Sequence, residues 1–505
     1  MAELRRLLVD GRPVAHPTAR NRGIGRYTLG LLRGLREVGA PVTAVHETDE
    51  EAELLLAAIP GLHVQRLRPA AVRAEATDGS AWFLATQLML HPIPLDPVPR
   101  IVTEAGLPVA AVMYDVIPER YPELYQVRPQ ARAQVQLRGA LARTLDVLLA
   151  ISRFAADTAA TELRFPHHRI AVIGAGVEPQ FVPASTDPWP LLDGVLADDG
   201  RQVVLMVSGG DTRKNTERLL QAWGRVPLDV RRAHRLVIVG AANPLLMSTW
   251  QRWAADAGVS GDVDLLGGLA DAQIVALHQL AALAVMPSLE EGFGLPVLEA
   301  AACGCPVITS NRSSLPEVLG EPAAEFDPYD TDSIAASLHA ALVDERLRDR
   351  LRAAGASAAQ RWTWARTATA VVASLEEIRP SQQRTSRLPG RRIALAGRFD
   401  TSVDGRANTE LAEAVAALST GPVVQLLAEE ALDATPQPTT LLRFPRRAMP
   451  RSVHPSQFDR VIELTGDGNG ARSARLDGAA FSLAGTADDA QTLLARLASI
   501  DDAAG

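Results

Sequence analysis

Residues 287–310 read Pro-Ser-Leu-Glu-Glu-Gly-Phe-Gly-Leu-Pro-Val-Leu-Glu-Ala-Ala-Ala-Cys-Gly-Cys-Pro-Val-Ile-Thr-Ser. The apolar run Leu283–Pro287 predicts a strand, the Gly-Phe-Gly sequence predicts a turn, and Leu295–Ala302 has the composition of a helix. Such a turn exposes backbone N–H groups at a helix N-terminus, where anionic or hydroxyl-rich ligands bind. Gly292 and Gly294 would let the main chain come close to such a ligand.

Two carboxylates flank this turn. Glu291 lies before the predicted helix, and Glu299 lies about one turn inside it. So placed, the pair can accept hydrogen bonds from sugar and ribose hydroxyls at the same time. The alternative interpretation is an exposed acidic turn before an ordinary helix.

Short apolar runs alternate with stretches of helical spacing through residues 1–183. Their continuous hydrophobicity favours a parallel sheet covered on both faces, and hence a Rossmann-like domain. We predict helices at Gly30–Val38 and Pro129–Leu145. The predicted strands are Arg5–Asp10, Pro41–His46, Ala81–Thr86, Val109–Tyr114 and Val147–Ile151.

The pattern restarts after a connection rich in Pro, Asp and Trp, and predicts a second Rossmann-like domain over residues 184–378. The fold class is therefore α/β, with a cleft between the carboxyl ends of two sets of strands. The predicted strands are Val203–Val207, Arg235–Gly240, Val263–Leu266, Leu283–Pro287 and Pro306–Thr309. The predicted helices are Thr216–Trp223, Asp271–Leu280, Leu295–Ala302 and Thr331–Leu342.

Residues 379–391 are polar, contain proline and lack periodicity, so they are predicted to be a linker. Residues 392–505 are predicted to form a small α/β extension. Its expected strands are Arg392–Leu395, Val423–Leu427 and Val461–Leu464, and its expected helix is Asn408–Leu418. Two interpretations stay open for it: a truncated, non-catalytic half-transferase, or an unrelated accessory domain.

A basic pair follows another strand end, in the sequence Ser-Gly-Gly-Asp-Thr-Arg-Lys-Asn that begins at Ser208. Arg213 can bind phosphate oxygens with its forked guanidinium, and Lys214 can add a point charge. The N-terminus of the following helix favours an anion at the same place. The segment predicts a diphosphate site that includes Ser208 and Gly209, the alternative being a solvated basic turn.

Two segments of the first domain add candidate residues. Asn21–Leu32 contains Gly-Ile-Gly-Arg-Tyr, in which Gly23 and Gly25 predict a tight loop before a helix. The strand Val109–Tyr114 is followed by Asp115, at the expected carboxyl edge of the sheet.

Together these motifs resemble the retaining glycosyltransferases of family 4 (glycosyl transferases group 1), which have the GT-B fold. The family signature is Glu, seven residues and Glu around Gly-Phe-Gly, and the resemblance spans Arg5 to Ile378. It includes a helix from Trp362 that crosses back to the first domain. Where many relatives have His-Asp this chain has Tyr114 and Asp115, and His46 and His91 are expected to be packed or surface residues.

The resemblance implies a role for each candidate. The first Glu of the signature contacts the donor sugar, the second contacts the nucleotide ribose, and the Lys neutralises the leaving diphosphate. The implied catalytic residues are Glu291, Lys214, Arg213 and Asp115. The implied donor-binding residues are Glu299, Gly292, Phe293, Gly294, Leu295, Gly23, Gly25, Ser208 and Gly209.

The expected activity is transfer of a sugar, with retention, from a nucleoside-diphosphate sugar to a hydroxyl of a glycan or lipid-linked acceptor. The resemblance places such a reaction in the synthesis of surface polysaccharide, glycolipid or another glycoconjugate. No cofactor or metal is expected. Two alternatives stay open: a protein that binds sugar nucleotides without turnover, and a GT-B sugar-nucleotide epimerase.

Composition excludes several other classes. The formal net charge of -8 makes a nucleic-acid partner unexpected. Cys303 and Cys305 are too few for a disulfide framework and are expected to be packed as small apolar side chains.

No apolar run approaches the ~20 residues that span a bilayer, so a cytoplasmic protein is expected. An arc of Arg128, Arg132 and Arg143 opposite Leu137 and Leu141 predicts either peripheral contact with the inner membrane face or a plain solvated helix.

Overall fold

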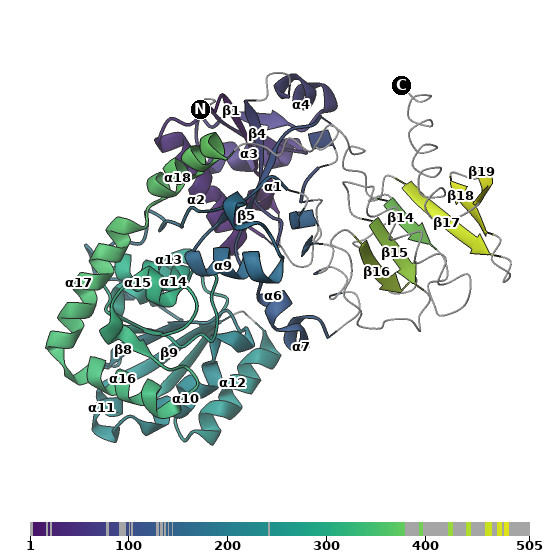
Figure 1. Ribbon diagram of the computed structural model, residues 1–505. Helices are drawn as coiled ribbons and strands as arrows, with labels where there is room; N and C mark the ends of the chain where they lie inside the picture. Colours follow the sequence, from purple (N-terminus) through teal and green to yellow (C-terminus); the bar gives the residue numbers. More distant parts are fainter. Residues whose placement is uncertain are drawn as a thin grey trace.

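The computed structural model contains two α/β units joined by a helix that crosses from one to the other (Figure 1). It describes residues 4–378 except 17–18, 21–22, 77–79, 90–96, 100, 103–104, 128–130, 132–134, 136–137, 140, 144 and 241–242. Beyond residue 378 it describes the backbone of six strands between residues 393 and 483.

The first unit is built on a sheet of seven parallel strands in the order β3-β2-β1-β4-β5-β6-β7. The order reverses between β1 and β4, and this switch point is where such sheets bind ligands. All five predicted strands are confirmed, and the short strands β3 and β7 were not predicted. The strands are β1 Arg6–Asp10, β2 Val42–His46, β3 Val64–Arg66, β4 Ala81–Ala85, β5 Val109–Met113, β6 Val147–Ala150 and β7 Ile170–Val172.

Helices cover this first sheet. The helix predicted at Gly30–Val38 begins seven residues earlier, because α2 spans Gly23–Glu37, so the Gly-Ile-Gly-Arg-Tyr motif is its first turn and not a loop. Much of the predicted helix Pro129–Leu145 lies outside the described residues. The helices are α1 Arg12–Ala15, α2 Gly23–Glu37, α3 Asp49–Ala58, α4 Pro69–Glu75, α6 Ile117–Arg120, α7 Pro122–Tyr125 and α9 Arg153–Glu162, with the 3₁₀ turn η1 His167–Arg169.

The second unit has six parallel strands in the order β10-β9-β8-β11-β12-β13. Its first four strands repeat the order of the first sheet, so its switch point lies between β8 and β11. All five predicted strands are confirmed, and the two-residue strand β13 was not predicted. The strands are β8 Gln202–Val207, β9 His234–Gly240, β10 Val263–Gly267, β11 Ala281–Met286, β12 Val307–Ser310 and β13 Glu325–Phe326.

The four helices predicted for the second unit are confirmed as α10, α13, α14 and α16. The α-helices are α10 Thr216–Arg225, α11 Leu228–Ala233, α12 Pro244–Asp256, α13 Asp271–Leu280, α14 Leu295–Ala302, α15 Leu315–Leu319, α16 Thr331–Val343 and α17 Glu345–Arg361. The 3₁₀ turns are η2 Trp189–Leu192, η3 Thr212–Lys214 and η4 Pro322–Ala324.

Helix α18 (Trp364–Glu377) returns to the first unit and packs on α2, as the resemblance implied. Two glycines of α2, one turn apart, make room for Trp364. A Cβ on Gly30 would lie 2.1 Å from the Trp364 ring, and one on Gly34 would lie 2.3 Å from its carbonyl oxygen. The two units are thereby held by close helix packing as well as by the chain connection.

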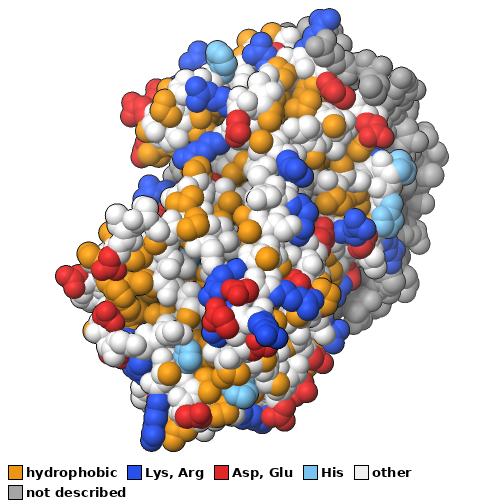
Figure 2. Space-filling view, turned by 90° about the vertical axis from the view of Figure 1, so that its left-hand side faces the viewer, with side chains coloured by type: hydrophobic (Ala, Val, Ile, Leu, Met, Phe, Trp, Pro, Cys, Tyr) orange, Lys and Arg blue, Asp and Glu red, His pale blue; other side chains and the backbone are white. Residues whose placement is uncertain are grey.

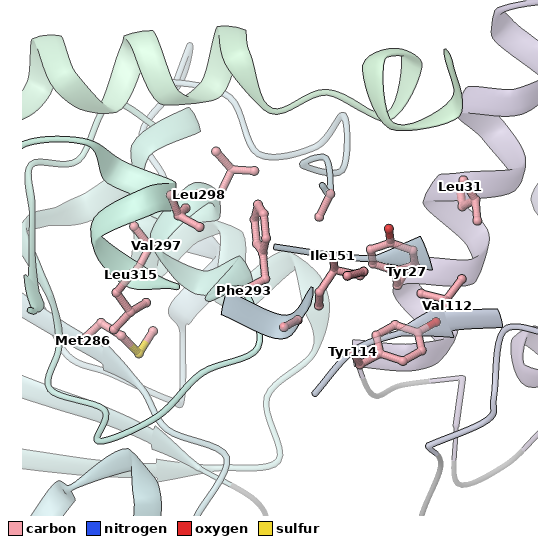
Figure 3. Close-up of a cluster of buried hydrophobic side chains, with 14 of the residues drawn as sticks. Tyr27, Leu31, Val112, Tyr114, Ile151, Met286, Phe293, Val297, Leu298 and Leu315 are labelled. Atoms are coloured by element: carbon pink, nitrogen blue, oxygen red, sulfur yellow. The ribbon is translucent and has the colours of Figure 1, made fainter. Parts of the chain in front are cut away.

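The hydrophobic core runs continuously through both units. Figure 3 shows the ring of Phe293 between second-unit side chains such as Val297 and first-unit side chains such as Ile151 and Tyr27. Phe293 is 3% exposed and stacks edge-on against Trp362, with ring centroids 5.2 Å apart. Burial of this ring stabilises the contact between the two units.

The described strands beyond residue 378 form a third sheet in the order β16-β15-β14-β17-β18-β19. Four neighbouring strands are parallel and repeat the β3-β2-β1-β4 order of the first sheet, whereas β18 and β19 are antiparallel. The three predicted strands are confirmed as β14, β15 and β17, and the predicted helix Asn408–Leu418 lies outside the described residues. The strands are β14 Ile393–Ala396, β15 Val423–Leu427, β16 Leu441–Pro445, β17 Arg460–Gly466, β18 Arg472–Leu476 and β19 Ala479–Leu483.

Acidic and basic side chains are interspersed on the face shown in Figure 2. Within the described part of the chain, no helix is both long and apolar enough to cross a membrane. Of the predicted arc, Arg128 and Arg132 lie outside the described residues, as does Leu137 on the opposite side. Leu141 is 6% exposed and packs in the core, which agrees with its predicted place opposite the arc.

Candidate functional site

Three charged side chains meet where β8 and β11 end. Lys214 Nζ lies 2.6 Å from Glu291 Oε1, and Arg213 Nη1 lies 2.7 Å from Glu291 Oε2. Arg213 Nη1 also donates to the Glu290 carbonyl oxygen at 2.8 Å. The residues come from two segments 77 positions apart in the sequence, which the sheet brings together at its switch point.

The charge of Glu291 is set by its two cationic partners. Burial by itself would raise the pKa of this carboxyl, but Arg213 and Lys214 more than offset that effect and lower it to about 2. Glu291 is therefore ionised at neutral pH, with its carboxylate shared between two cations. Such a group can exchange partners when a more highly charged anion, such as a diphosphate, arrives.

Serine hydroxyls fix the main chain around Glu291. The Glu291 N–H donates to Ser313 Oγ at 2.9 Å, and Ser314 Oγ donates to the carbonyl oxygens of Glu291 and Phe293 at 3.0 and 2.8 Å. Gly294 has φ +99°, a conformation that favours glycine, and it is the N-cap of α14. Helix α14 begins at Leu295, so the first backbone N–H groups of the helix have no partner within it.

The basic turn is held by buried polar contacts beneath it. Ser208 is 1% exposed, and its Oγ lies 3.1 Å from Thr216 Oγ1, so Ser208 supports the turn from below. Gly209 is exposed and has φ +70°. Asn215, which was not predicted, has φ +62° and donates through Nδ2 to the carbonyl oxygens of Pro287 and Pro328 at 3.1 and 2.7 Å. The sequence signal that could have identified Asn215 is its position directly after Arg213 and Lys214.

Asp115 lies on the first unit, against the turn that carries this cluster: a Cβ on Gly292 would be 3.2 Å from Asp115 Cβ. Its Oδ1 accepts from the Ile117 N–H at 3.1 Å. Burial raises the pKa of Asp115, while Arg213 lowers it and Glu291 raises it. The carboxyl is thus close enough to Arg213 and Glu291 for the charges of both residues to shift its pKa.

Tyr114 does not take the place of a reacting histidine. Its side chain is 7% exposed and points into the first unit, where its hydroxyl donates to the Thr86 carbonyl oxygen at 2.8 Å (Figure 3). Of the two histidines considered, His46 is 5% exposed and its Nδ1 lies 2.9 Å from the Thr48 carbonyl oxygen, as expected for a packed residue. His91 lies outside the described residues.

Glu299 forms a second cluster further along α14. Its Oε1 lies 3.7 Å from Nη1 of Arg26, which belongs to the first unit, and its Oε2 lies 3.8 Å from Nε2 of His278. Arg26 also donates to the carboxylate of Asp271. Burial raises the pKa of Glu299 to about 7, although Arg26 lowers it.

The predicted residues Gly23 and Gly25 lie in the first turn of α2, next to Arg26. A Cβ on Gly25 would lie 2.4 Å from the Ala19 carbonyl oxygen, so a close main-chain contact explains this glycine. Gly23 is exposed, and nothing described lies within 4 Å of a Cβ built on it. The motif thus brings Arg26 to the contact between the two units, and the sequence did not predict that residue.

A second set of contacts between the two units was also not predicted. Glu290 accepts from Arg120 Nε at 3.1 Å and from the Tyr121 hydroxyl at 2.8 Å, and the Tyr125 hydroxyl donates to Asp211 at 2.6 Å. Glu290 precedes Glu291 in the sequence, and the signature spacing singled out Glu291 but gave Glu290 no role. In the structure Glu290 binds the first unit and Glu291 binds the basic pair.

Two further expectations concern metals and cysteines. No group of three His, Cys, Asp or Glu side chains within the described residues is placed to hold a metal ion. Cys303 and Cys305 are both free thiols and buried, which confirms the expectation of packed side chains.

Residues 192–358 match the family model described as glycosyl transferases group 1. The serotype-specific mannosyltransferase WbdA of Escherichia coli is 30% identical over 284 residues, which cover 54% of this chain and 34% of WbdA. The O-antigen chain mannosyltransferase B of Escherichia coli is 31% identical over 229 residues, covering 45% of this chain and 59% of the relative. The match therefore spans between one third and three fifths of these relatives.

The fold is similar to that of solved glycosyltransferases. HepE from Anabaena, solved in complex with UDP and glucose, superposes with a TM-score of 0.56 at 16% identity, covering 74% of this chain and all of that one. A glycosyltransferase from Rickettsia africae has a TM-score of 0.53 at 16% identity, covering 75% of this chain and 99% of that one. The chain therefore has the GT-B fold, and its second unit is similar to the glycosyl transferases group 1.

Proposed function

We propose that this protein transfers a hexose, with retention of configuration, from a nucleoside-diphosphate sugar to a hydroxyl of a glycan or lipid-linked acceptor. The observation that carries the proposal is the convergence of Arg213 and Lys214 on Glu291 at the switch point of the second sheet. A cationic pair can bind the diphosphate of a sugar nucleotide, and a carboxylate in contact with that pair can bind the hydroxyl-bearing sugar.

In this proposal the donor replaces the ion pairs that Arg213 and Lys214 form with Glu291. The diphosphate competes with Glu291 for Arg213 and Lys214, which frees the Glu291 oxygens to accept hydrogen bonds from sugar hydroxyls. The ribose diol binds Glu299, the second carboxylate of the signature. The partial positive charge at the N-terminus of α14 stabilises the diphosphate further.

The proposed reaction exchanges one bond at the anomeric carbon for another on the same face. The bond from this carbon to the β-phosphate oxygen breaks as the bond to the acceptor oxygen forms, and the acceptor proton passes to the leaving phosphate. Arg213 and Lys214 stabilise the negative charge that develops on the diphosphate. Two relatives are named mannosyltransferases, so mannose donors come first among the sugars to test.

The test incubates the full chain with GDP-mannose or UDP-glucose, with and without an oligosaccharide acceptor, and measures nucleoside diphosphate release. Release that requires the acceptor, with an α-linked product by NMR, supports the proposal. Binding without release would indicate a sugar-nucleotide-binding protein, and acceptor-independent conversion of the sugar would indicate an epimerase. Lys214→Ala is the matched inactive variant.

A further inference from the structure

Glu299 is a buried carboxylate whose neighbours are mostly unable to stabilise its charge. His278 Nε2 is 3.8 Å away, but this ring is 1% exposed and burial lowers its pKa to about 3, so it stays neutral. Asp271 and Glu178 are negative and disfavour a further negative charge here. Lys214 adds a weaker positive influence from η3, and Cys303 interacts with the carboxyl from the end of α14.

Arg26 is the cation with the largest effect on Glu299, and it comes from the opposite unit. Its Nη1 lies 3.7 Å from Glu299 Oε1, and its side chain is 25% exposed where that of Glu299 is 10% exposed. Its other nitrogen, Nη2, donates to Asp271 on α13, so the guanidinium is held between two carboxylates of the second unit. The residue lies in the first turn of α2, and the packing of Trp364 on Gly30 fixes that helix against α18.

We infer that Arg26 is a positioning residue for the nucleotide-binding carboxylate. From the first unit it supplies the positive charge that favours the ionised form of Glu299, which accepts hydrogen bonds from a ribose, so that nucleotide affinity depends on a residue of the first unit. The inference rests on the proposed function, since it takes Glu299 as the ribose-binding group. Arg26 acts through Glu299 and Asp271 and is not itself required to touch the donor.

The physical reason is the protonation of Glu299. An ionised carboxylate accepts hydrogen bonds at both oxygens, whereas a protonated carboxyl has a donor on one oxygen and less acceptor capacity for the two ribose hydroxyls. Burial holds the pKa of Glu299 at about 7 in the presence of Arg26, and loss of this cation moves the pKa further up. If Arg26 is removed while the units stay together, the protonated fraction of Glu299 at neutral pH rises and the carboxyl loses acceptor capacity.

The test compares wild type with Arg26→Ala, Arg26→Lys and Arg36→Ala by calorimetric titration with UDP-glucose and GDP-mannose. The diphosphate of each probe keeps its charge between pH 6.5 and 8.5, and titration of the base is the same for every variant, so a pH-dependent difference between variant and wild type belongs to the protein. Arg36 is the control because it lies on the same helix, is exposed, and is placed in no site. We expect Arg26→Ala to weaken binding about tenfold at pH 6.5 and by less than about threefold at pH 8.5. Arg26→Lys should stay within about threefold of wild type throughout.

A second measurement separates this role from a structural one. The melting temperature of Arg26→Ala should fall further below wild type as pH rises from 6 to 8, because the unpaired carboxylate becomes charged. That pH dependence should vanish in a Glu299→Gln background. An affinity loss that is equal at every pH would mean that Arg26 binds the donor directly and would overturn the inference. If wild type binds neither probe, the proposed function itself fails.

Discussion

The main chain of Gly292 lies directly against the carbonyl oxygen of Tyr114: a Cβ built on Gly292 would be 2.1 Å from that oxygen. The two residues belong to different units, so this contact measures how closely the units approach at the site. Beside it, Ser152 Oγ donates to the Gly292 carbonyl oxygen at 2.6 Å, which fastens the same turn to the first unit. Glycine is thus required at position 292 because the two units pack closely there, in addition to any close approach of a ligand to this turn.

Gly292→Ala is therefore expected to hold the units apart while leaving each of them folded. A displacement of about 1 Å at a reacting centre costs on the order of 100-fold in rate, so kcat/KM should fall by about that factor. Steady-state kinetics and the radius of gyration from small-angle scattering measure the two effects. Gly261→Ala is the control, because nothing lies within 4 Å of a Cβ built there. Unchanged kinetics in Gly292→Ala would show that closure is not needed for turnover.

Because of Glu291, the free energy of unfolding should decrease as the pH becomes acidic. Its folded-state pKa of about 2 is below the ordinary value of 4.5, so its contribution is present above pH 4.5 and is lost as pH falls toward 2. The contribution is roughly 3 kcal/mol, since each pKa unit corresponds to about 1.4 kcal/mol. Urea unfolding of wild type and Glu291→Gln between pH 7 and 3 should show a free-energy difference that shrinks on acidification. A difference that stays constant would contradict the assigned ion pairs.

The two carboxylates of the signature should separate nucleotide binding from sugar binding. Glu299→Ala should weaken the free nucleoside diphosphate and the sugar nucleotide alike, because the ribose is common to both. Glu291→Ala should chiefly lower turnover and the preference for the sugar nucleotide. Calorimetric titration with both ligands measures the two affinities, and steady-state kinetics measures kcat. Equal affinity of wild type and Glu299→Ala for the free diphosphate would show that the assignment is wrong.

Activity should survive chelation by EDTA. Arg213 and Lys214 supply the positive charge that a divalent ion would otherwise bring to the diphosphate. Initial rates with and without an excess of EDTA make the comparison. Loss of activity that magnesium or manganese restores would refute metal independence.

A chain ending at Pro380 should bind nucleotide with the affinity of the full chain. All of the contacts described for Glu291 and Glu299 lie upstream of that residue, and α18 is retained. Melting temperature and circular dichroism establish that the shorter chain is folded. If a folded chain of this length binds nucleotide more than about tenfold more weakly, which is 1.4 kcal/mol, the third sheet contributes to the site.

The sequence by itself determined the sheet architecture and the motifs. Continuous apolar runs predict buried parallel strands because both faces of such a strand are covered, and those of β8 and β11 were correct within two residues. Gly-Phe-Gly before Leu295 likewise predicted the start of α14, since a turn with positive φ needs glycine. Strands as short as β13 left no such pattern, because two residues carry no periodicity.

Only the tertiary structure decided which charges face one another. Glu290 and Glu291 are adjacent and chemically identical, yet one binds the first unit and the other binds Lys214. Arg26 and Glu299 are 273 positions apart by numbering, and no local pattern relates them. Their contact exists because α18 packs on α2 and brings the two units together. Local sequence sets secondary structure through short-range sterics and periodicity, whereas the protonation of a buried carboxylate depends on charges that long-range packing places beside it.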